Sequence, residues 1–258
     1  MNKLVSIIMP SYNSAEFIRE SIASVLAQTY NNWELIIVDD CSMDDTDKIV
    51  AEFADERIHY YKNERNSGAA VSRNNALKIA KGKWVAFLDS DDLWIPEKLE
   101  KQISFMEQNG YHFSYTEYAQ IKEDGQMLGV ICTGPKKISN IKMHTYNYIG
   151  CLTVMYDREF IGEIQIADVK KRNDYAIWLK VIKKANCYLL PEILALYRIR
   201  ESGSITSRNS GVSKLIKHHY ILFKESEGEN AVMSMFYTML NLFFGVYKKV
   251  KYTKKQSK

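Results

Sequence analysis

AFLDSDDLW, at residues 86–94, carries the apolar run Trp84–Leu88 directly into three aspartates within four positions. The run has the length and composition of a buried strand, and Asp89, Asp91 and Asp92 stand where that strand would end. Like charges this close raise one another's pKa and destabilise a fold unless a positive charge neutralises them. We therefore expect a strand whose carboxyl end binds a cation.

Over the first 95 residues, short β-branched runs alternate with amphipathic segments of helical length, the pattern of parallel strands joined by crossover helices. The expected strands are Val5–Met9, Glu34–Val38, Ile58–Tyr61 and Trp84–Leu88. The expected helices begin after Ser14, at Ser42 or Asp44, and at Ala69. Ligands bind beyond the carboxyl ends of such strands, so the loops at Pro10–Asn13, Asp39-Asp40, Lys62-Asn63 and Asp89–Asp91 should meet at one edge.

After Pro96 the pattern changes to a mixture of helices and antiparallel strands. The expected helices are Glu97–Gln108 and a second one within Asp168–Ala185. The expected strands are Tyr111–Tyr118, Gln126–Cys132 after an Asp124-Gly125 turn, Ile149–Tyr156, Tyr188–Leu190 and Ile193–Arg198. We expect one domain over residues 1–208, with halves 1–95 and 96–208, and a helical extension with a basic tail over 209–258.

The composition excludes several classes of protein. With 258 residues and 46% hydrophobic content, the chain can bury a sizeable core. The formal charge is +4, but six lysines lie in the last eleven residues, so the remaining chain is mildly acidic. We therefore expect no nucleic-acid partner.

The cysteines and the N-terminus point to a reducing compartment. Cys41, Cys132, Cys151 and Cys187 form no C-x-x-C pair, which favours free thiols over zinc ligation. The apolar run Leu4–Met9 is too short for a signal core and stops at Pro10. We expect a cytoplasmic protein.

Neither G-x-G-x-x-G after the first strand nor G-x-x-x-x-G-K-[ST] occurs in the sequence, so phosphate would have to be bound by other means. A Mg²⁺ or Mn²⁺ ion on the D-x-D cluster would serve, because both ions prefer oxygen ligands and bridge carboxylates to a diphosphate. The alternative is that these aspartates only cap the helix near Pro96 and form a turn.

Six stretches of the chain resemble family 2 glycosyltransferases with the GT-A fold. They cover residues 1 to about 208 and read VSIIMPSYNSAEFIRESIASVLAQTY from 5, WELIIVDDCSMDDT from 33, NSGAAVSRNNAL from 66, FLDSDDLW from 87, and DYAIWLK with LALYRIRESGSIT from 174 and 194. The resemblance extends to bacterial enzymes of cell-surface polysaccharide assembly, among them the teichuronic acid glycosyltransferases. It implies an α/β fold with a Rossmann-like, mostly parallel central sheet flanked by helices.

The resemblance also implies roles for single residues. Contacts with a nucleotide sugar are implied for Pro10, Ser11, Tyr12, Asp40, Arg73, Asp89, Ser90 and Arg198. It implies that Asp40 accepts a hydrogen bond from uracil and that Asp91 binds the metal; whether Asp92 shares the metal stays open. The plain structural alternatives are that Tyr12 packs on the sheet, Asp40 caps the following helix and Arg73 pairs with an acid.

Asp174 is the expected catalytic base. It precedes an apolar stripe of helical spacing in KKRNDYAIWLKVIKK, where the family most often has Glu-Asp and this chain has Asn173-Asp174. Sugar transfer needs a carboxylate that takes the proton of the acceptor hydroxyl. A helix N-cap is its structural alternative. Downstream, Arg198 and Arg200 could contact the diphosphate from the Ser/Gly-rich loop, which could also act as a lid or be an ordinary surface loop.

The segment from Ala231 has about seventeen mostly apolar residues before the lysines, at the short limit for crossing a bilayer. We expect a helix that lies on the membrane surface, its lysines attracted to anionic lipid, or that binds a partner. Packing on its own domain, or on a second subunit of a homo-oligomer, is the alternative.

The resemblance, together with the aspartate cluster, implies an inverting glycosyltransferase that uses a UDP-sugar and Mn²⁺ or Mg²⁺. The acceptor would be a hydroxyl of a growing cell-surface polysaccharide or of a lipid-linked glycan, which suits a peripheral position on the inner face of the cytoplasmic membrane. Two alternatives remain, a metal-dependent nucleotidyltransferase and a non-catalytic scaffold of a polysaccharide assembly complex. PSYNSAEF lacks the basic, glycine-rich loop that the first alternative needs for a triphosphate.

Overall fold

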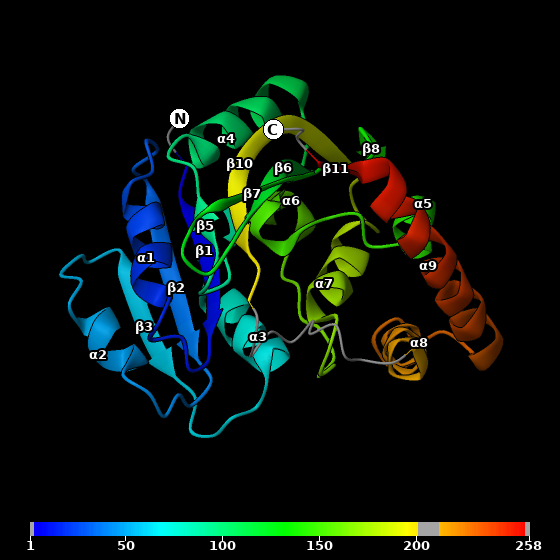
Figure 1. Ribbon diagram of the computed structural model, residues 1–258, viewed down its shortest axis with the longest axis horizontal. Coiled ribbons are helices and arrows are strands. Elements are labelled where there is room, and N and C mark those ends of the chain that lie inside the picture. The colour runs from blue at the N-terminus through cyan, green and yellow to red at the C-terminus, as the bar shows by residue number, and fades with distance from the viewer. Residues whose placement is uncertain (1–2, 201–211, 256–258) are drawn as a thin grey trace.

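Four parallel strands make up one side of the central sheet in the computed structural model, which describes residues 3–200 and 212–255 (Figure 1). They are β1 (Val5–Ser11), β2 (Trp33–Asp39), β3 (Ile58–Lys62) and β4 (Trp84–Phe87), in the order β3-β2-β1-β4. The register pairs Ser11 with Asp39 and Asp39 with Lys62. These four strands confirm the predicted ones, and their carboxyl ends lie at one edge.

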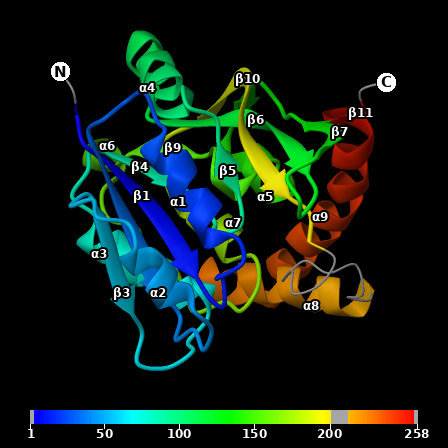
Figure 2. The ribbon, with the colours of Figure 1, turned by 60° about the vertical axis from the view of Figure 1, so that its left-hand side comes forward.

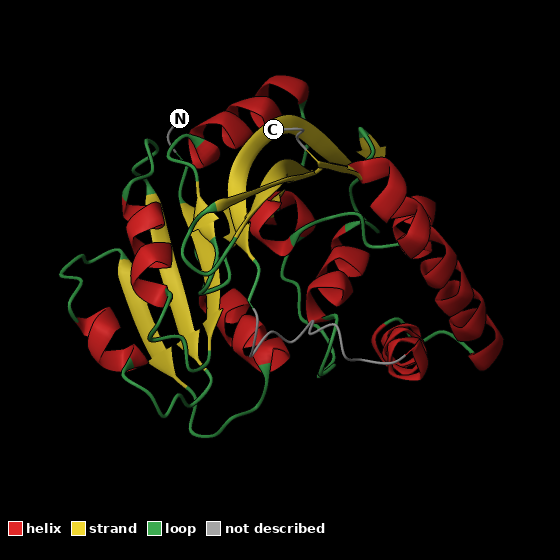
Figure 3. Cartoon of the chain, in the orientation of Figure 1, coloured by secondary structure: helices red, strands yellow, loops and turns green. Residues whose placement is uncertain are grey.

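Successive side chains of a strand point to opposite faces of the sheet. Both faces of these strands are apolar, and helices cover each of them. Val5, Ile7 and Met9 of β1 pack in one cluster with residues of α1 (Ile18–Leu26), α2 (Thr46–Ala51) and α4 (Lys98–Asn109). Ile8 packs in the other cluster with α3 (Ala69–Ile79) and α7 (Asn173–Val181). The molecule is therefore a sheet between two helical layers (Figure 3).

The second side of the sheet is mixed. β9 (Met155–Asp157) runs antiparallel between β4 and β6 (Phe113–Ile121), and β6 forms the predicted hairpin with β7 (Met127–Cys132). β10 (Cys187–Arg198) runs parallel to β6 and also pairs with β5 (Leu93–Trp94) and β8 (Lys137–Ile138). The short helices α5 (Asn140–Thr145) and α6 (Arg158–Ile161) complete this side.

Two predicted boundaries in this half are wrong. Cys151–Thr153 form a 3₁₀ turn instead of strand, because the indole of Trp94 donates to the Leu152 carbonyl over 2.8 Å, which removes that acceptor from any ladder. Two predicted strands are one strand, β10, whose register shifts around Pro191, as proline lacks a ladder donor. The predicted helix within Asp168–Ala185 is confirmed as α7, which begins at Asn173 after the left-handed Arg172.

The C-terminal part contains α8 (Val212–Ile221), a π-helical segment (Leu222–Ser226), α9 (Ala231–Tyr252) and β11 (Thr253–Lys255). α9 packs on α5 and α8, at the opposite side of the molecule from α2 and β3 (Figures 1 and 2). β11 pairs antiparallel with β7 and forms the last strand of the sheet, which no sequence pattern predicted. The division into residues 1–208 and 209–258 stays a prediction.

Candidate active site

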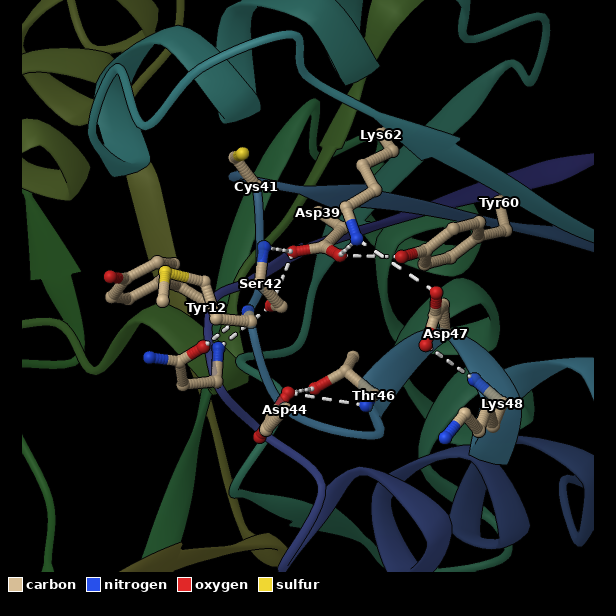
Figure 4. A network of polar contacts seen from close by, with 12 residues as sticks. Tyr12, Asp39, Cys41, Ser42, Asp44, Thr46, Asp47, Lys48, Tyr60 and Lys62 are labelled. Atoms are coloured by element: carbon tan, nitrogen blue, oxygen red, sulfur yellow. Dashed lines mark hydrogen bonds and ion pairs between the residues drawn. The ribbon is translucent and has the colours of Figure 1, made fainter.

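The loops that follow β1 and β2 interlock (Figure 4). Asp39, at the end of β2, accepts hydrogen bonds from the backbone N–H of Ser42 over 3.0 Å and from the hydroxyl of Tyr60, and Lys62 lies 3.9 Å away. Across the gap between the loops, the N–H of Asn13 donates to the Ser42 hydroxyl over 2.8 Å. Hydrogen bonds thus connect the two strand ends at the predicted edge.

Three residues, Pro10, Ser11 and Tyr12, are predicted to contact the nucleotide base. Pro10 and Ser11 lie within β1 and are buried. The Ser11 hydroxyl has no hydrogen-bond partner among the described residues. Tyr12 is 48% exposed, so the alternative that it merely packs on the sheet does not hold. Its ring is free to stack on a planar ligand, whereas Ser11 could receive only a group that reaches into the buried strand end.

Asp40 is buried, and both of its carboxylate oxygens accept hydrogen bonds. Oδ1 accepts from the Asn63 amide and the Ser67 N–H, each over 2.9 Å, and Oδ2 accepts from the Gly68 N–H over 2.6 Å. These bonds hold the segment that leads into α3, not the start of α2 that the capping alternative named. Asp40 therefore shapes the edge of the site whether or not it also contacts a base.

Arg73 of α3 joins two walls of the site. Its guanidinium donates to Asp89, just beyond β4, and to Asn173, the first residue of α7. Burial opposes its charge most strongly, but the attraction of Asp89 and of the other acidic groups around it together outweighs burial and raises the pKa of Arg73. The preceding Ser72 accepts from the Asn63 amide that also holds Asp40. The ion-pair alternative for Arg73 is thus real, and the pair lies inside the predicted site.

The aspartate cluster contains two different environments. Asp92 is 1% exposed and accepts from the Arg198 N–H over 2.9 Å; burial and the charges of Asp91 and Asp89 raise its pKa well above the usual value. Asp89 and Asp91 keep about 30% and 29% of their side-chain surface exposed. Burial and the charge of Asp89 also raise the pKa of Asp91. Ser90 is fixed by a 2.7 Å hydroxyl contact with Ser14 of the β1 loop.

These carboxylates fit a metal only in part. Within residues 3–200 and 212–255, no cluster of three or more His, Cys, Asp or Glu side chains could hold an ion. Asp89 and Asp91, however, are neighbouring, accessible oxygen donors, and Mn²⁺ or Mg²⁺ often uses one or two carboxylates together with substrate phosphates. The donor set therefore suits an ion that binds together with a diphosphate.

Asp174 is not a helix N-cap. Arg172 occupies that position with a φ of 62°, and Asp174 is the second residue of α7. Its carboxylate accepts a 3.2 Å hydrogen bond from the amide of Asn147. Three non-glycine residues in the described chain are left-handed, namely Arg172, Asn13 and Cys41, and each is next to a predicted site segment. Such backbone strain concentrates at functional sites.

The two arginines after β10 differ. The Arg198 guanidinium is fully buried and donates to the carbonyls of Asp91 and Glu123 and to the carboxylate of Glu20, so none of its contacts is directed to the carboxylates of the cluster. Arg200 instead lies 3.5 Å from the Asp91 carboxylate. The remainder of the predicted lid, residues 201–208, is outside the described residues.

Sequence reasoning missed three contributors to the site. In the sequence, Asn173 stood out only as a departure from the family's Glu-Asp pair. In the structure, its side-chain oxygen accepts a hydrogen bond from Arg73. No sequence signal distinguishes Asn147, which holds Asp174. Lys248 of α9 donates to the Asn147 carbonyl over 3.1 Å, a contact that joins residues about a hundred positions apart.

A cavity of about 700 Å³ lies elsewhere, between α4, the start of β10 and β11. Four of its lining residues are the aromatic Tyr111 and Tyr188 and the basic Lys137 and Lys254. None of the predicted site residues lines it. The candidate active site is therefore defined by the contacts at the strand ends and not by this cavity.

Comparison with known proteins identifies the family. Residues 6–154 match the model of glycosyl transferase family 2. The putative teichuronic acid biosynthesis glycosyltransferase TuaG of Bacillus subtilis is 44% identical over 87% of this chain and 88% of its own. The UDP-Glc:α-D-GlcNAc-diphosphoundecaprenol β-1,3-glucosyltransferase WfgD of Escherichia coli is 41% identical over 95% of this chain and 94% of its own.

Solved structures show the same fold. Residues 1–349 of TarS from S. aureus, crystallised with UDP-GlcNAc, superpose with a TM-score of 0.70 at 21% identity, over 89% of this chain and 69% of that one. The mannosyltransferase PcManGT of Pyrobaculum calidifontis, solved with GDP-Man and Mn²⁺, gives 0.65 at 16% identity, over 96% and 73%. The predicted GT-A fold is confirmed. The chain, whose family match spans more than half its length, is a family 2 glycosyltransferase.

Proposed function

We propose that this glycosyltransferase moves a sugar, with inversion, from a UDP-sugar to a hydroxyl of a lipid-linked glycan or growing surface polysaccharide, at the inner face of the cytoplasmic membrane. The names of the relatives support this choice: WfgD uses UDP-Glc and a diphosphoundecaprenol acceptor, and TuaG belongs to teichuronic acid biosynthesis. TarS was crystallised with UDP-GlcNAc.

One observation carries the proposal. Arg73 connects Asp89, at the strand edge suited to a diphosphate, with Asn173, which precedes the candidate base Asp174. An acceptor hydroxyl near Asp174 would therefore lie beside a sugar whose diphosphate is bound at the edge. This arrangement, a base on one wall and a phosphate site on the other, is what direct displacement requires.

The reaction follows from that arrangement. The acceptor oxygen forms a bond to the anomeric carbon while its proton passes to the Asp174 carboxylate. The bond from the anomeric carbon to the UDP oxygen breaks, and UDP leaves with the electron pair. Attack opposite the leaving group inverts the anomeric configuration. We place the guanidinium of Arg200, which lies beside Asp91, near the departing diphosphate. Arg198, which is buried and pairs with Glu20, has no role in this proposal.

Asp91, with Asp89, would hold Mn²⁺ or Mg²⁺, and the ion when bound would offset negative charge on the departing UDP. Burial and the like charge of Asp89 raise the pKa of Asp91, and a bound cation would offset the repulsion between the two carboxylates. The proposed neighbours of the nucleotide base remain Pro10, Ser11, Tyr12 and Asp40. Ser90 positions the loop between Asp89 and Asp91. Asp92, buried and engaged by Arg198, is not included.

The test is to measure UDP release from a panel of UDP-sugars with Mn²⁺, and UDP affinity by calorimetry. Asp174→Asn should lower the rate by roughly 10²- to 10⁴-fold while UDP affinity stays within about threefold, as expected for loss of a general base. Asp91→Asn should remove the Mn²⁺-dependent part of UDP binding. Asp168→Asn, an exposed carboxylate before α7, is the matched control and should behave like wild type.

Several outcomes would contradict the proposal. If Asp174→Asn kept the full rate, Asp174 would not be the base. If the wild type bound UDP but released none with any donor and acceptor, the scaffold alternative would be correct. Incorporation of a nucleotidyl group from a triphosphate would favour the nucleotidyltransferase alternative, which the family match does not support.

A further inference from the structure

α9 buries a polar face and exposes an apolar one, the reverse of the usual arrangement of a surface helix. Its buried side chains are the polar Ser234, Thr238 and Asn241, which face the rest of the molecule. Asn241 donates to the His144 carbonyl over 2.9 Å, and Thr238 donates to the Ser234 carbonyl over 2.7 Å. A surface helix ordinarily buries its apolar stripe and exposes its polar one. Here the polar stripe is the one that packs.

The inner stripe continues to the site. Gly245 has no room for a side chain, since a Cβ there would lie 2.9 Å from the ring of Tyr146. One turn further, Lys248 donates to the Asn147 carbonyl, and Asn147 holds Asp174. The inner face of α9 is thus specified by its contacts, and the orientation of the helix follows from them.

The outer face is apolar over the whole helix. Exposed side chains recur at spacings of three and four residues, with exposed fractions of 78% at Val232, 52% at Phe236, 58% at Met239, 69% at Phe243, 67% at Val246 and 81% at Val250. At 1.5 Å per residue, the 22 residues of α9 span about 33 Å. Contiguous apolar surfaces of this kind mark interaction sites.

The charge next to this stripe indicates what covers it. Lys249, Lys251, Lys254 and Lys255 are exposed at its C-terminal end, and residues 231–258 contain no aspartate or glutamate. Pairing of β11 with β7 holds Lys254 and Lys255 in place. A second copy of this lysine-rich end would bring like charges together without a carboxylate of its own, whereas an anionic lipid surface supplies both an apolar interior and negative headgroups.

We propose that α9 lies in the plane of an anionic bilayer surface, with its outer stripe between the lipid headgroups and its lysines on phosphate groups. In the described residues no helix is long and apolar enough to span a membrane, which agrees with a position along the surface. This deepens the proposed function, because a lipid-linked acceptor would then be at hand. Vesicle binding itself can be measured without any sugar donor.

The experiment is co-sedimentation of the full chain with vesicles of phosphatidylcholine alone or with about 30% phosphatidylglycerol, which is roughly a physiological anionic content. We expect at least about tenfold stronger binding to the anionic vesicles, weakened by added salt. Phe243→Glu should reduce this binding at least about tenfold. Met43→Glu, which alters an 88% exposed apolar residue in the loop between β2 and α2, should match wild type.

The possible failures are distinct. Equal binding of wild type and Phe243→Glu, or no sedimentation of the wild type, overturns the docking surface. Analytical ultracentrifugation tests for a dimer. If the wild type were a dimer that did not bind vesicles, and Phe243→Glu dissociated it, the outer stripe would bind a second copy and the membrane proposal would be overturned. Thermal melting tests whether Phe243→Glu is folded. UDP release by wild type in the absence of vesicles tests the proposed function separately, so either proposal can fail alone.

Discussion

Arg73 and Asn173 are hydrogen-bonded side chain to side chain although a hundred positions separate them in the sequence. Arg73 lies on α3, which belongs to the parallel half of the sheet, and Asn173 begins α7 in the mixed half. The same guanidinium also holds Asp89. One buried cation therefore fixes the distance between the proposed diphosphate edge and the segment that carries Asp174.

Arg73→Lys is expected to damage catalysis more than it damages donor binding. A lysine keeps the charge but lacks the planar fork that reaches Asp89 and Asn173 together. We expect kcat to fall roughly 10- to 100-fold, because small displacements of reacting groups cost about this much. The measurement is steady-state UDP release. Arg19→Lys, which alters an exposed pair with Glu52, is the control, and an equal loss there would contradict the assignment.

Asp40→Asn tests whether Asp40 shapes the loop. One amide N–H₂ would replace an oxygen that now accepts from Ser67 or Gly68, so a donor would face a donor. A buried, mismatched group of this kind costs about 1–3 kcal/mol of unfolding free energy. Thermal or urea unfolding measures it, with Asp124→Asn in the exposed hairpin turn as control. If stability were unchanged and UDP binding were weaker, the role of Asp40 would instead be to contact the nucleotide base.

The sequence predicted the parallel strands and the clustering of their polar ends, because hydrophobic runs and topology determine both. It could not predict how α7 and α9 approach the site. Asn147 and Lys248 reach Asp174 only through tertiary packing, and neither residue type stands out in a polar, lysine-rich context. Nor could it predict the contacts of Arg198, whose role as a diphosphate contact stays a prediction: its guanidinium donates to the Glu20 carboxylate of α1 and to the Asp91 carbonyl.

Lys248→Met should alter the pH dependence of the rate. Burial lowers the pKa of Lys248 to about 8, so at pH 7 it is an ammonium that donates to Asn147 and attracts the Asp174 carboxylate. We expect the variant to be about 3- to 10-fold slower at pH 7, from the loss of this charge. Above pH 9 wild-type Lys248 is neutral and the two rates should converge. Lys249→Met, on the exposed neighbour, should show the wild-type profile; a constant ratio across pH would contradict the charge effect.

The last prediction concerns the stability of the fold around α4. Lys98 is fully buried; its amine donates to Gln102 over 2.9 Å and lies 4.1 Å from the centre of the Trp94 ring. Burial lowers its pKa to about 7. Between that value and the ordinary 10.5, the unfolded chain binds a proton that the folded chain does not. This residue therefore destabilises the fold near pH 7, and its contribution improves as the pH rises toward 10.

Lys98→Met should therefore raise the free energy of unfolding at pH 7, by roughly 2–4 kcal/mol if the methionine fills the same space. The gain should shrink between pH 7 and pH 10, because the unfolded wild-type chain then loses the proton that favours it. Urea unfolding at several pH values measures both effects. Lys101→Met, on the exposed side of α4 and paired with Glu192, should change stability by less than about 0.5 kcal/mol. A loss of stability in Lys98→Met would mean that Gln102 and the Trp94 ring stabilise the buried amine more than burial destabilises it.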